Sequence, residues 1–406
     1  MKPCDQTCTS SNDSSVFSSH PLSQEASFLD SQLSFASVPS LATSPQNQCH
    51  VLNMNHRCVA TLKGQNSYTS SLLLYGGFFF TGSSDGEIRL WKHDALRSTM
   101  DSENLTDDNM VVAGKGAVKA LVAAEDKIIS AHQDHKIRVW KVDKLNNDHQ
   151  KFTHLATLPT LSDRALKIFL PKNHVQVRRH KTCTWVHHVD TVSALAISSD
   201  ESLLYSVSWD RTLKIWRTTD FKCLESIAKA HDDAINTIIT SSDDHIYTGS
   251  SDKKIKVWKQ TPGDMKHYLV ATLEKHKSGV NALALSRDGS TLYSGAGDRS
   301  ILVWTKTAGS GYMAAVGALR GHTKSILCLA TVSDLVCSGS ADNTVRIWRG
   351  TENSYSCVAV LEGHKGPVKC ITVAFDPTSE TISTYLLYSA SLDFDIKVWQ
   401  IFLPPE

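Results

Sequence analysis

The stretch from Ser338 to Trp348, Ser-Gly-Ser-Ala-Asp-Asn-Thr-Val-Arg-Ile-Trp, contains a polar spacing that occurs seven times along the chain. In each copy a Ser or Thr stands four residues before an Asp, and a Trp stands six residues after that Asp. Alternating apolar residues before each Trp, as in Ile255-Lys256-Val257-Trp258, predict a short strand. The seven sets are Thr81/Asp85/Trp91, Ser130/Asp134/Trp140, Ser206/Asp210/Trp216, Thr248/Asp252/Trp258, Ser294/Asp298/Trp304, Ser338/Asp342/Trp348 and Ser389/Asp393/Trp399.

Five of these units also carry a His, which stands 16 to 25 residues before the Ser or Thr. An indole N–H only donates a hydrogen bond, a hydroxyl and a neutral His donate and accept, and an ionised Asp only accepts. A buried chain from Trp through Ser/Thr and His to Asp therefore satisfies every polar group in it. A lone Ser, His and Asp set would also fit a catalytic triad, but five copies that each include a Trp predict a structural role. These expected structural sets are His188/Ser206/Asp210/Trp216, His231/Thr248/Asp252/Trp258, His276/Ser294/Asp298/Trp304, His322/Ser338/Asp342/Trp348 and His364/Ser389/Asp393/Trp399. At the corresponding position the first two units have Gln65 and Gly114, so neither is expected to complete the chain of hydrogen bonds.

Repeats of about 40 to 45 residues, built from short strands and closed by a Trp, are typical of propeller blades. The pattern resembles the WD40 family over about 350 of the 406 residues. That resemblance implies an all-β, seven-bladed propeller over residues 53–406. The run Cys58–Gly64 parallels Cys357–Gly363, and the sequence ends seven residues after Trp399. We therefore expect residues 57–62 to supply the outer strand of the seventh blade, which would close the ring.

The N-terminal region has a different composition. Residues 1–50 hold thirteen serines, four prolines and few charges, too little apolar surface to offset the cost of ordering the chain. We expect residues 1–52 to be a disordered Ser-rich regulatory tail, with Ser44, which precedes a Pro, as the candidate phosphosite. A plain solubilising tail, and a docking patch around residues 28–35, are the alternatives.

A basic insertion is expected at residues 159–185, because the closing Trp residues of units two and three, Trp140 and Trp216, lie farther apart than those of any other two successive units. Residues 171–181 and 187–193 resemble the corresponding segment of plant WD40 proteins of the JINGUBANG type. This resemblance implies a non-enzymatic plant regulator in the cytoplasm and nucleus that acts through protein contacts and restrains pollen germination. The basic residues of the insertion are Arg164, Lys167, Lys172, Arg178, Arg179 and Lys181.

The turn that carries each Asp and the loop that carries each His are expected at the same end of the blade, which by family resemblance is the partner-binding face. Trp and Arg dominate the energetics of many interfaces, each contributing roughly 2 kcal/mol or more when central. Packing between neighbouring loops is the alternative explanation for apolar residues at these turns. The candidate partner-binding residues are Trp209, Arg211, Leu392, Phe394, Gln133 and Arg299.

Composition narrows the function classes. The net charge of +1 gives no overall attraction to nucleic acid or an anionic membrane. The ten cysteines form no C-x2-C pair, and no phosphate-binding loop, H-E-x-x-H or G-x-S-x-G motif occurs. No catalytic residue, metal, cofactor or membrane span is therefore expected. We expect a monomer that binds other proteins, among them a transcription regulator. The alternatives are a substrate receptor of a cullin-type ubiquitin ligase, although W-D-x-R is absent, and anionic-ligand (nucleic acid or lipid) binding by the insertion.

Overall fold

The structure is a computed structural model. The chain separates into two units, residues 1–37 and residues 38–406, and every residue described here belongs to the second. The described residues are 38–41, 54–63, 67–92, 110–112, 114, 116–143, 151–168, 174–178, 181–307, 313–351, 354–376 and 384–403. The candidate phosphosite Ser44 and the rest of the expected tail before Met54, apart from residues 38–41, lie outside this set.

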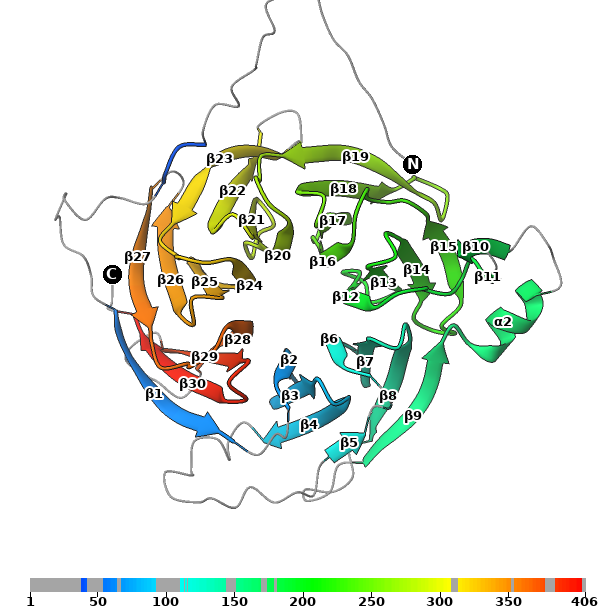
Figure 1. The fold of residues 1–406 in the computed structure, drawn as a ribbon, viewed down its shortest axis with the longest axis horizontal. Helices are drawn as coiled ribbons and strands as arrows, with labels where there is room; N and C mark the ends of the chain where they lie inside the picture. Colours follow the sequence, from blue (N-terminus) through cyan, green and yellow to red (C-terminus); the bar gives the residue numbers. More distant parts are fainter. Residues whose placement is uncertain are drawn as a thin grey trace, which may run out of the picture. The chain divides into compact units, whose positions relative to one another are not determined.

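Seven four-stranded antiparallel sheets are arranged as the blades of a propeller around a common axis (Figure 1). Blades 1 to 6 each use four consecutive strands, with the innermost strand first in sequence. Blade 1 comprises β2 (Thr69–Tyr75), β3 (Phe78–Ser83), β4 (Glu87–Lys92) and β5 (Met110–Val112); blade 2 β6 (Val118–Ala124), β7 (Lys127–His132), β8 (Ile137–Asp143) and β9 (Lys151–Leu158); blade 3 β12 (Val192–Ile197), β13 (Leu203–Ser208), β14 (Leu213–Arg217) and β15 (Cys223–Ile227); blade 4 β16 (Ile235–Thr240), β17 (His245–Ser250), β18 (Lys254–Gln260) and β19 (His267–Glu274); blade 5 β20 (Val280–Leu285), β21 (Thr291–Ala296), β22 (Ser300–Lys306) and β23 (Met313–Arg320); blade 6 β24 (Ile326–Val332), β25 (Leu335–Ser340), β26 (Val345–Thr351) and β27 (Ser354–Leu361); blade 7 β28 (Val368–Phe375), β29 (Thr384–Ser391), β30 (Ile396–Phe402) and β1 (Asn55–Leu62).

The ring is closed by β1, as the sequence predicts. This strand pairs antiparallel with β30, from Asn55 opposite Phe402 to Leu62 opposite Ile396. Blade 7 therefore takes three strands from the end of the sequence and its outer strand from residues more than 300 positions earlier (Figure 1). The backbone groups along β30 find partners on β1, so this edge of the sheet is not left open.

The hydrophobic core lies between neighbouring blades. Every residue of β13 and β29, which are second strands, is buried, because the other strands of the sheet flank them and adjacent sheets cover both faces. Between blades 7 and 1 the rings of Phe79 and Tyr388 stack with centroids 4.5 Å apart. The outer strands have neighbours on one side only, so β1 and β19 are largely exposed or half-buried.

The insertion contains regular structure, although the sequence pattern predicts no element there. It holds the helix α2 (Leu161–Ile168) and a hairpin of β10 (His174–Arg178) and β11 (Lys181–Thr184). Thr160 caps the helix, because its Oγ1 accepts a hydrogen bond from the Asp163 N–H at 3.3 Å. The buried Asp163 carboxylate in turn accepts a hydrogen bond from the Cys223 N–H at 2.7 Å, which fixes the helix to blade 3.

Four residues of the expected tail are ordered, so the prediction of disorder over residues 1–52 needs correction at Val38–Leu41. Ser40 forms a parallel bridge with Ala318 on β23. The Leu41 N–H donates to the Ala318 carbonyl at 3.0 Å, and the Ala318 N–H donates to the Pro39 carbonyl at 2.9 Å. Val38 and Leu41 pack against the hydrophobic clusters on either side of blade 5. The segment thus extends blade 5 outward.

Candidate functional site

The buried polar sets have the same geometry in five blades. In blade 6 the Trp348 indole donates to Ser338 Oγ at 2.9 Å, Ser338 Oγ lies 2.8 Å from His322 Nε2, and His322 Nδ1 lies 2.8 Å from an Asp342 carboxylate oxygen. In blades 3, 4, 5 and 7 the equivalent distances all fall between 2.8 and 3.2 Å. Each hydroxyl-bearing residue is fully buried between its Trp and its His. No face of the Ser or Thr oxygen is open to a substrate.

The indole rings of these sets belong to the hydrophobic core as well as to the hydrogen-bond chain. Trp216 donates to Ser206 at 2.9 Å, is 1% exposed and lies in the apolar cluster between blades 2 and 3. Trp304 donates to Ser294 at 2.8 Å, is 3% exposed and lies in the cluster between blades 4 and 5. The sequence predicts Trp216 and Trp304 as members of buried structural sets, and the structure adds that both rings also pack in the apolar core. A buried indole contributes a large apolar area while its N–H requires an acceptor, so both rings serve packing and neither is open to a ligand.

The Asp of each set also shapes the turn at the end of the blade. One Asp342 oxygen accepts from the Thr344 N–H at 3.1 Å, and the other accepts from the Thr323 N–H at 2.9 Å in the His loop. The turn and the His loop are thereby joined at one end of the blade. The residue after each of the seven Asp residues has a φ between 67° and 95°, in the left-handed region: Gly86, His135, Arg211, Lys253, Arg299, Asn343 and Phe394.

In the polar set of blade 6 the surroundings shift the pKa of both titratable groups. Burial raises the pKa of Asp342, but the hydrogen bond from Thr344 and the adjacent His322 outweigh it and lower that pKa to about 2. Burial lowers the pKa of His322, and Asp342 only partly opposes this effect. In blade 6 Asp342 is therefore ionised and His322 neutral near pH 7, as the Trp-to-Asp order of donors and acceptors requires.

All six candidate partner-binding residues are exposed, and each stands directly beside a turn Asp. Trp209 is 42% exposed, Leu392 40% and Phe394 50%, so packing between loops does not bury them. Arg211, Arg299 and Phe394 occupy left-handed turn positions, which disfavour side chains other than Gly and Asn. Gln133 precedes the Asp of blade 2.

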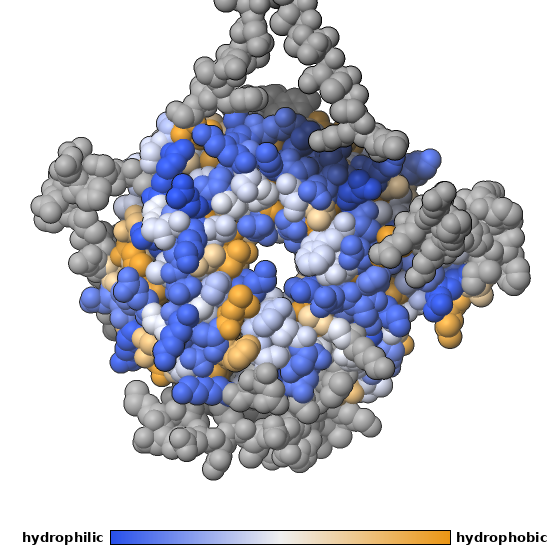
Figure 2. All heavy atoms as spheres, viewed as in Figure 1, coloured by the Kyte–Doolittle hydropathy of each residue, from blue (hydrophilic) through white to orange (hydrophobic). Residues whose placement is uncertain are grey.

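A cavity of about 340 Å³ lies at the centre of the ring and is lined by the innermost strands of all seven blades. Figure 2 shows a hollow there, with hydrophobic side chains gathered on the side of β24 and β28. In every blade the strand register slips after the first residue of the innermost strand, so the second residue is bulged out of the ladder. The seven bulged residues line the cavity: Ser70, Lys119, Ser193, Asn236, Asn281, Leu327 and Lys369.

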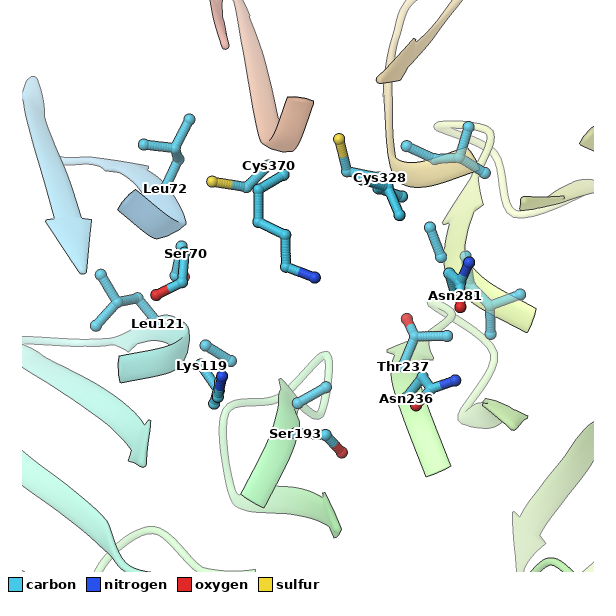
Figure 3. A pocket seen from close by; sticks show the side chains of 18 of the residues that line it. Ser70, Leu72, Lys119, Leu121, Ser193, Asn236, Thr237, Asn281, Cys328 and Cys370 are labelled. Atoms are coloured by element: carbon cyan, nitrogen blue, oxygen red, sulfur yellow. The ribbon is translucent and has the colours of Figure 1, made fainter. Parts of the chain in front are cut away.

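Side chains at the start of the innermost strands link one blade to the next. Asn236 donates to the Val280 carbonyl at 2.9 Å, and Asn281 donates to the Ile326 carbonyl at 2.8 Å. Ser70, Ser193, Cys328 and Cys370 make equivalent contacts with the following blade. Lys119 differs, because its ammonium lies 5.8 Å from the centre of the Trp209 ring. Figure 3 shows these labelled side chains around a common space.

Comparison with known families agrees with this geometry. The family described as WD domain, G-beta repeat matches six segments, which together cover more than half of the chain: residues 56–92, 180–217, 221–259, 267–305, 314–349 and 355–400. This chain belongs to the WD40 family.

Several proteins that share similarity with this chain come from fungi. The ribosome biogenesis protein YTM1 of Eremothecium gossypii is 23% identical over 158 residues, 36% of this chain and 34% of that protein. Mitochondrial division protein 1 of Saccharomyces cerevisiae is 25% identical over 192 residues, 40% of this chain and 26% of that protein. A probable cytosolic iron-sulfur protein assembly protein 1 of Neurospora crassa is 40% identical over 74 residues, 18% and 16% of the two chains. The chain thus spans about a third or less of each relative's length.

Blade 2, outside the matched WD40 segments, builds its polar set from other residues. Its Ser130 accepts from Trp140 at 3.0 Å and contacts His132 Nε2 at 2.8 Å. Arg138 binds both oxygens of Asp134, at 3.1 and 2.5 Å. A Cβ on Gly114 would lie 2.9 Å from the Arg138 guanidinium, so the Gly at the usual His position makes room for the Arg.

The sequence supports part of this arrangement in blade 2. The expectation that blade 2 lacks the standard set is correct, but its replacement was missed. Gly114 together with an Arg four residues after Asp134 was the available signal.

In six of the seven units a Lys or Arg stands two residues before the closing Trp, and the sequence predicts that its apolar stem packs along the sheet while its charge reaches water. For Lys214 this expectation is wrong, because the residue is 1% exposed and its ammonium donates to the Trp185 carbonyl and to Ser226. A lysine so deeply buried needs these oxygen partners to offset the loss of hydration. Lys214 therefore anchors the end of the insertion to blade 3.

The structure only partly places the basic residues of the insertion. Arg164 is exposed on α2, beside a second cavity of about 770 Å³ between β9 and the helix. Lys167 lies on α2, Arg178 on β10 and Lys181 on β11, while Lys172 and Arg179 fall outside the described residues. Within the described ranges, no cluster of His, Cys, Asp and Glu suits a metal ion. In the same ranges, no helix has both the length and the apolar character needed to cross a membrane.

Proposed function

We propose that this WD40 propeller is a non-enzymatic scaffold that binds a segment of a partner protein on the face carrying the Asp turns. The observation that carries the proposal is the exposure of Trp209, Arg211, Leu392 and Phe394 beside the turn Asp residues, together with the place of Trp209 in the lining of the central cavity. Large aromatic and Arg side chains supply most of the binding energy in protein interfaces.

The backbone conformation of these turn residues is shared between blades. Arg211 and Phe394 have φ angles of 67° and 70°. A residue with a Cβ in the left-handed region costs roughly 1 kcal/mol relative to Gly. Lys253 and Asn343 adopt the same conformation in blades 4 and 6, so Arg211 and Phe394 are distinguished from them by their residue type and not by their backbone.

The test compares two pairs of glycine substitutions. Arg211→Gly/Phe394→Gly removes the proposed contacts, and Lys253→Gly/Asn343→Gly removes side chains at the same turn position in blades 4 and 6. Both pairs relieve left-handed strain, so both variants should melt at or above the wild-type temperature. In proximity labelling, the amount of labelled partner should fall at least tenfold with the first pair of substitutions and stay at the wild-type level with the second.

Equal partner recovery from both pairs would contradict this site. If partners were instead lost from a chain with Arg164→Gln, Lys167→Gln, Arg178→Gln and Lys181→Gln, the basic insertion would be the binding surface. That result would favour the alternative of an anionic ligand held by the insertion.

We further propose a plant regulator of the JINGUBANG type, located in cytoplasm and nucleus, that restrains pollen germination by binding a transcription regulator. This finer proposal is supported by the resemblance of residues 171–181 and 187–193 and by the Ser-rich N-terminal region. Wild-type germination timing in pollen that lacks the protein would contradict it. The cullin-ligase alternative is not proposed, because W-D-x-R is absent from the sequence.

A further inference from the structure

One wall of the central cavity carries positive charge without a matching carboxylate. Lys119 of blade 2 and Lys369 of blade 7 both line the cavity, and no Asp or Glu lines it. Over the part of the chain that the structure describes, neither ammonium forms an ion pair. Figure 3 shows Lys119 among the polar side chains of the cavity wall.

The two lysines are placed by the same structural device. Each is the bulged second residue of an innermost strand, so its side chain leaves the strand ladder and lines the central space. Blade 1 lies between blades 7 and 2, and its bulged residue is the small Ser70. The cationic wall therefore consists of Lys369, Ser70 and Lys119 on three successive blades.

The remaining bulged residues are uncharged. Ser193, Asn236 and Asn281 use their hydroxyl or amide hydrogens to bind carbonyls of the next blade, and Leu327 is apolar. Burial, and then the charge of Lys369, lower the pKa of Lys119, so the positive charge on this wall is uncompensated. A bound anion would remove that penalty.

Access to this wall comes from the proposed partner face. The Lys119 ammonium lies beside the exposed Trp209 ring, and Trp209 itself lines the cavity. A group that enters between the Asp turns would therefore pass Trp209 before it reached the lysines.

We propose that Lys119 and Lys369 form a binding site for a phosphate group that enters the central cavity from the face. Two ammonium groups suit a phosphate dianion better than a single carboxylate, because Lys acts as a point charge toward phosphate. This proposal adds a ligand to the proposed function. It rests on that function in one respect, because the phosphate is taken to enter from the partner-binding face. The phosphate is either a free small anion or part of a phosphorylated side chain of the partner segment.

The experiment measures binding of two probes to the full chain at low salt by titration calorimetry. Pyrophosphate represents a free anion, and an acetylated, amidated Gly-phosphoserine-Gly peptide represents a phosphorylated side chain; its unphosphorylated form is the control. Lys119→Gln/Lys369→Gln is expected to weaken binding of the preferred probe at least tenfold. Lys253→Gln/Lys277→Gln removes the same charge from exposed positions on the face, and should change binding less than twofold.

Each outcome is decisive. Preference for pyrophosphate identifies a small-anion site, and preference for the phosphopeptide identifies a side-chain site. If the wild-type protein binds neither probe at 10 mM, the proposal is overturned. Equal weakening of binding by the two lysine pairs would also overturn it, because the anion would then respond only to the general positive charge of the protein surface. These titrations involve no partner protein, so their failure is distinct from failure of partner capture by the turn residues.

Discussion

At the residue scale, hydrogen-bonding capacity explains which positions recur. Ser338 accepts from Trp348 and contacts His322, and no apolar residue could serve both neighbours. The same requirement explains blade 2. This blade has no His in the loop, and His132 on the same strand contacts Ser130 in its place. The hydrogen bonds from Trp through Ser and His to Asp could be predicted from sequence. The Arg138–Asp134 ion pair that replaces part of this set in blade 2 could not, because it depends on the space beside Gly114.

The buried histidines make stability sensitive to acid. Burial, followed by the charge of Arg138, lowers the pKa of His132 from 6.5 to about 4. Between these values the unfolded chain binds the proton that folded His132 excludes, so stability falls as pH drops from 6.5 to 4. Below pH 4 the low pKa of Asp342, about 2, extends the loss.

His132→Gln should therefore flatten this pH dependence, by up to about 3 kcal/mol across the interval. Urea unfolding at pH 4.5 and 7.5 measures the effect. His56→Gln, at an exposed position on β1, is the matched control and should retain the wild-type difference. An unchanged difference in the His132 variant would contradict the assignment.

At the element scale, the closing strand β1 and the Asp turns could be predicted by comparing one repeat with another. The helix α2 and the Val38–Leu41 segment lie outside the repeats and could not. The match between Cys58–Gly64 and Cys357–Gly363 identified β1 correctly. Neither the helix α2 nor the Val38–Leu41 contact shows a repeat pattern. Their positions depend on tertiary contacts outside the repeat, such as that of the Asp163 carboxylate with the Cys223 N–H and those of Leu41 with Ala318.

Truncation separates these contributions. Removing residues 1–37 should leave the melting temperature unchanged, because every described contact begins at Val38. Removing residues 1–50 should lower it by a few degrees, since the hydrogen bonds and apolar contacts with β23 are lost. Removing residues 1–64 deletes β1, exposes β30 and should prevent cooperative folding. Equal melting temperatures for the last two truncations would contradict closure by β1.

At the scale of the whole molecule, the ring divides its residues between two tasks. Buried polar sets hold each turn in place, and the side chains displayed on those turns and in the central cavity remain available for ligands. Sequence spacing located the turns and their exposed residues. It could not locate the cationic wall, because Lys119 and Lys369 are 250 positions apart and meet only through the bulges of blades 2 and 7.

The most direct test of this division is partner capture by Ser338→Ala. The substitution leaves the Trp348 indole and His322 without their buried partner, which should cost about 2–4 kcal/mol of stability. Ser242→Ala, at an exposed loop position, should cost less than about 0.5 kcal/mol. Measured well below its melting temperature, Ser338→Ala should label the same partners as wild type. A folded Ser338→Ala protein that lost those partners would show that the buried sets take part in function, and would contradict the account.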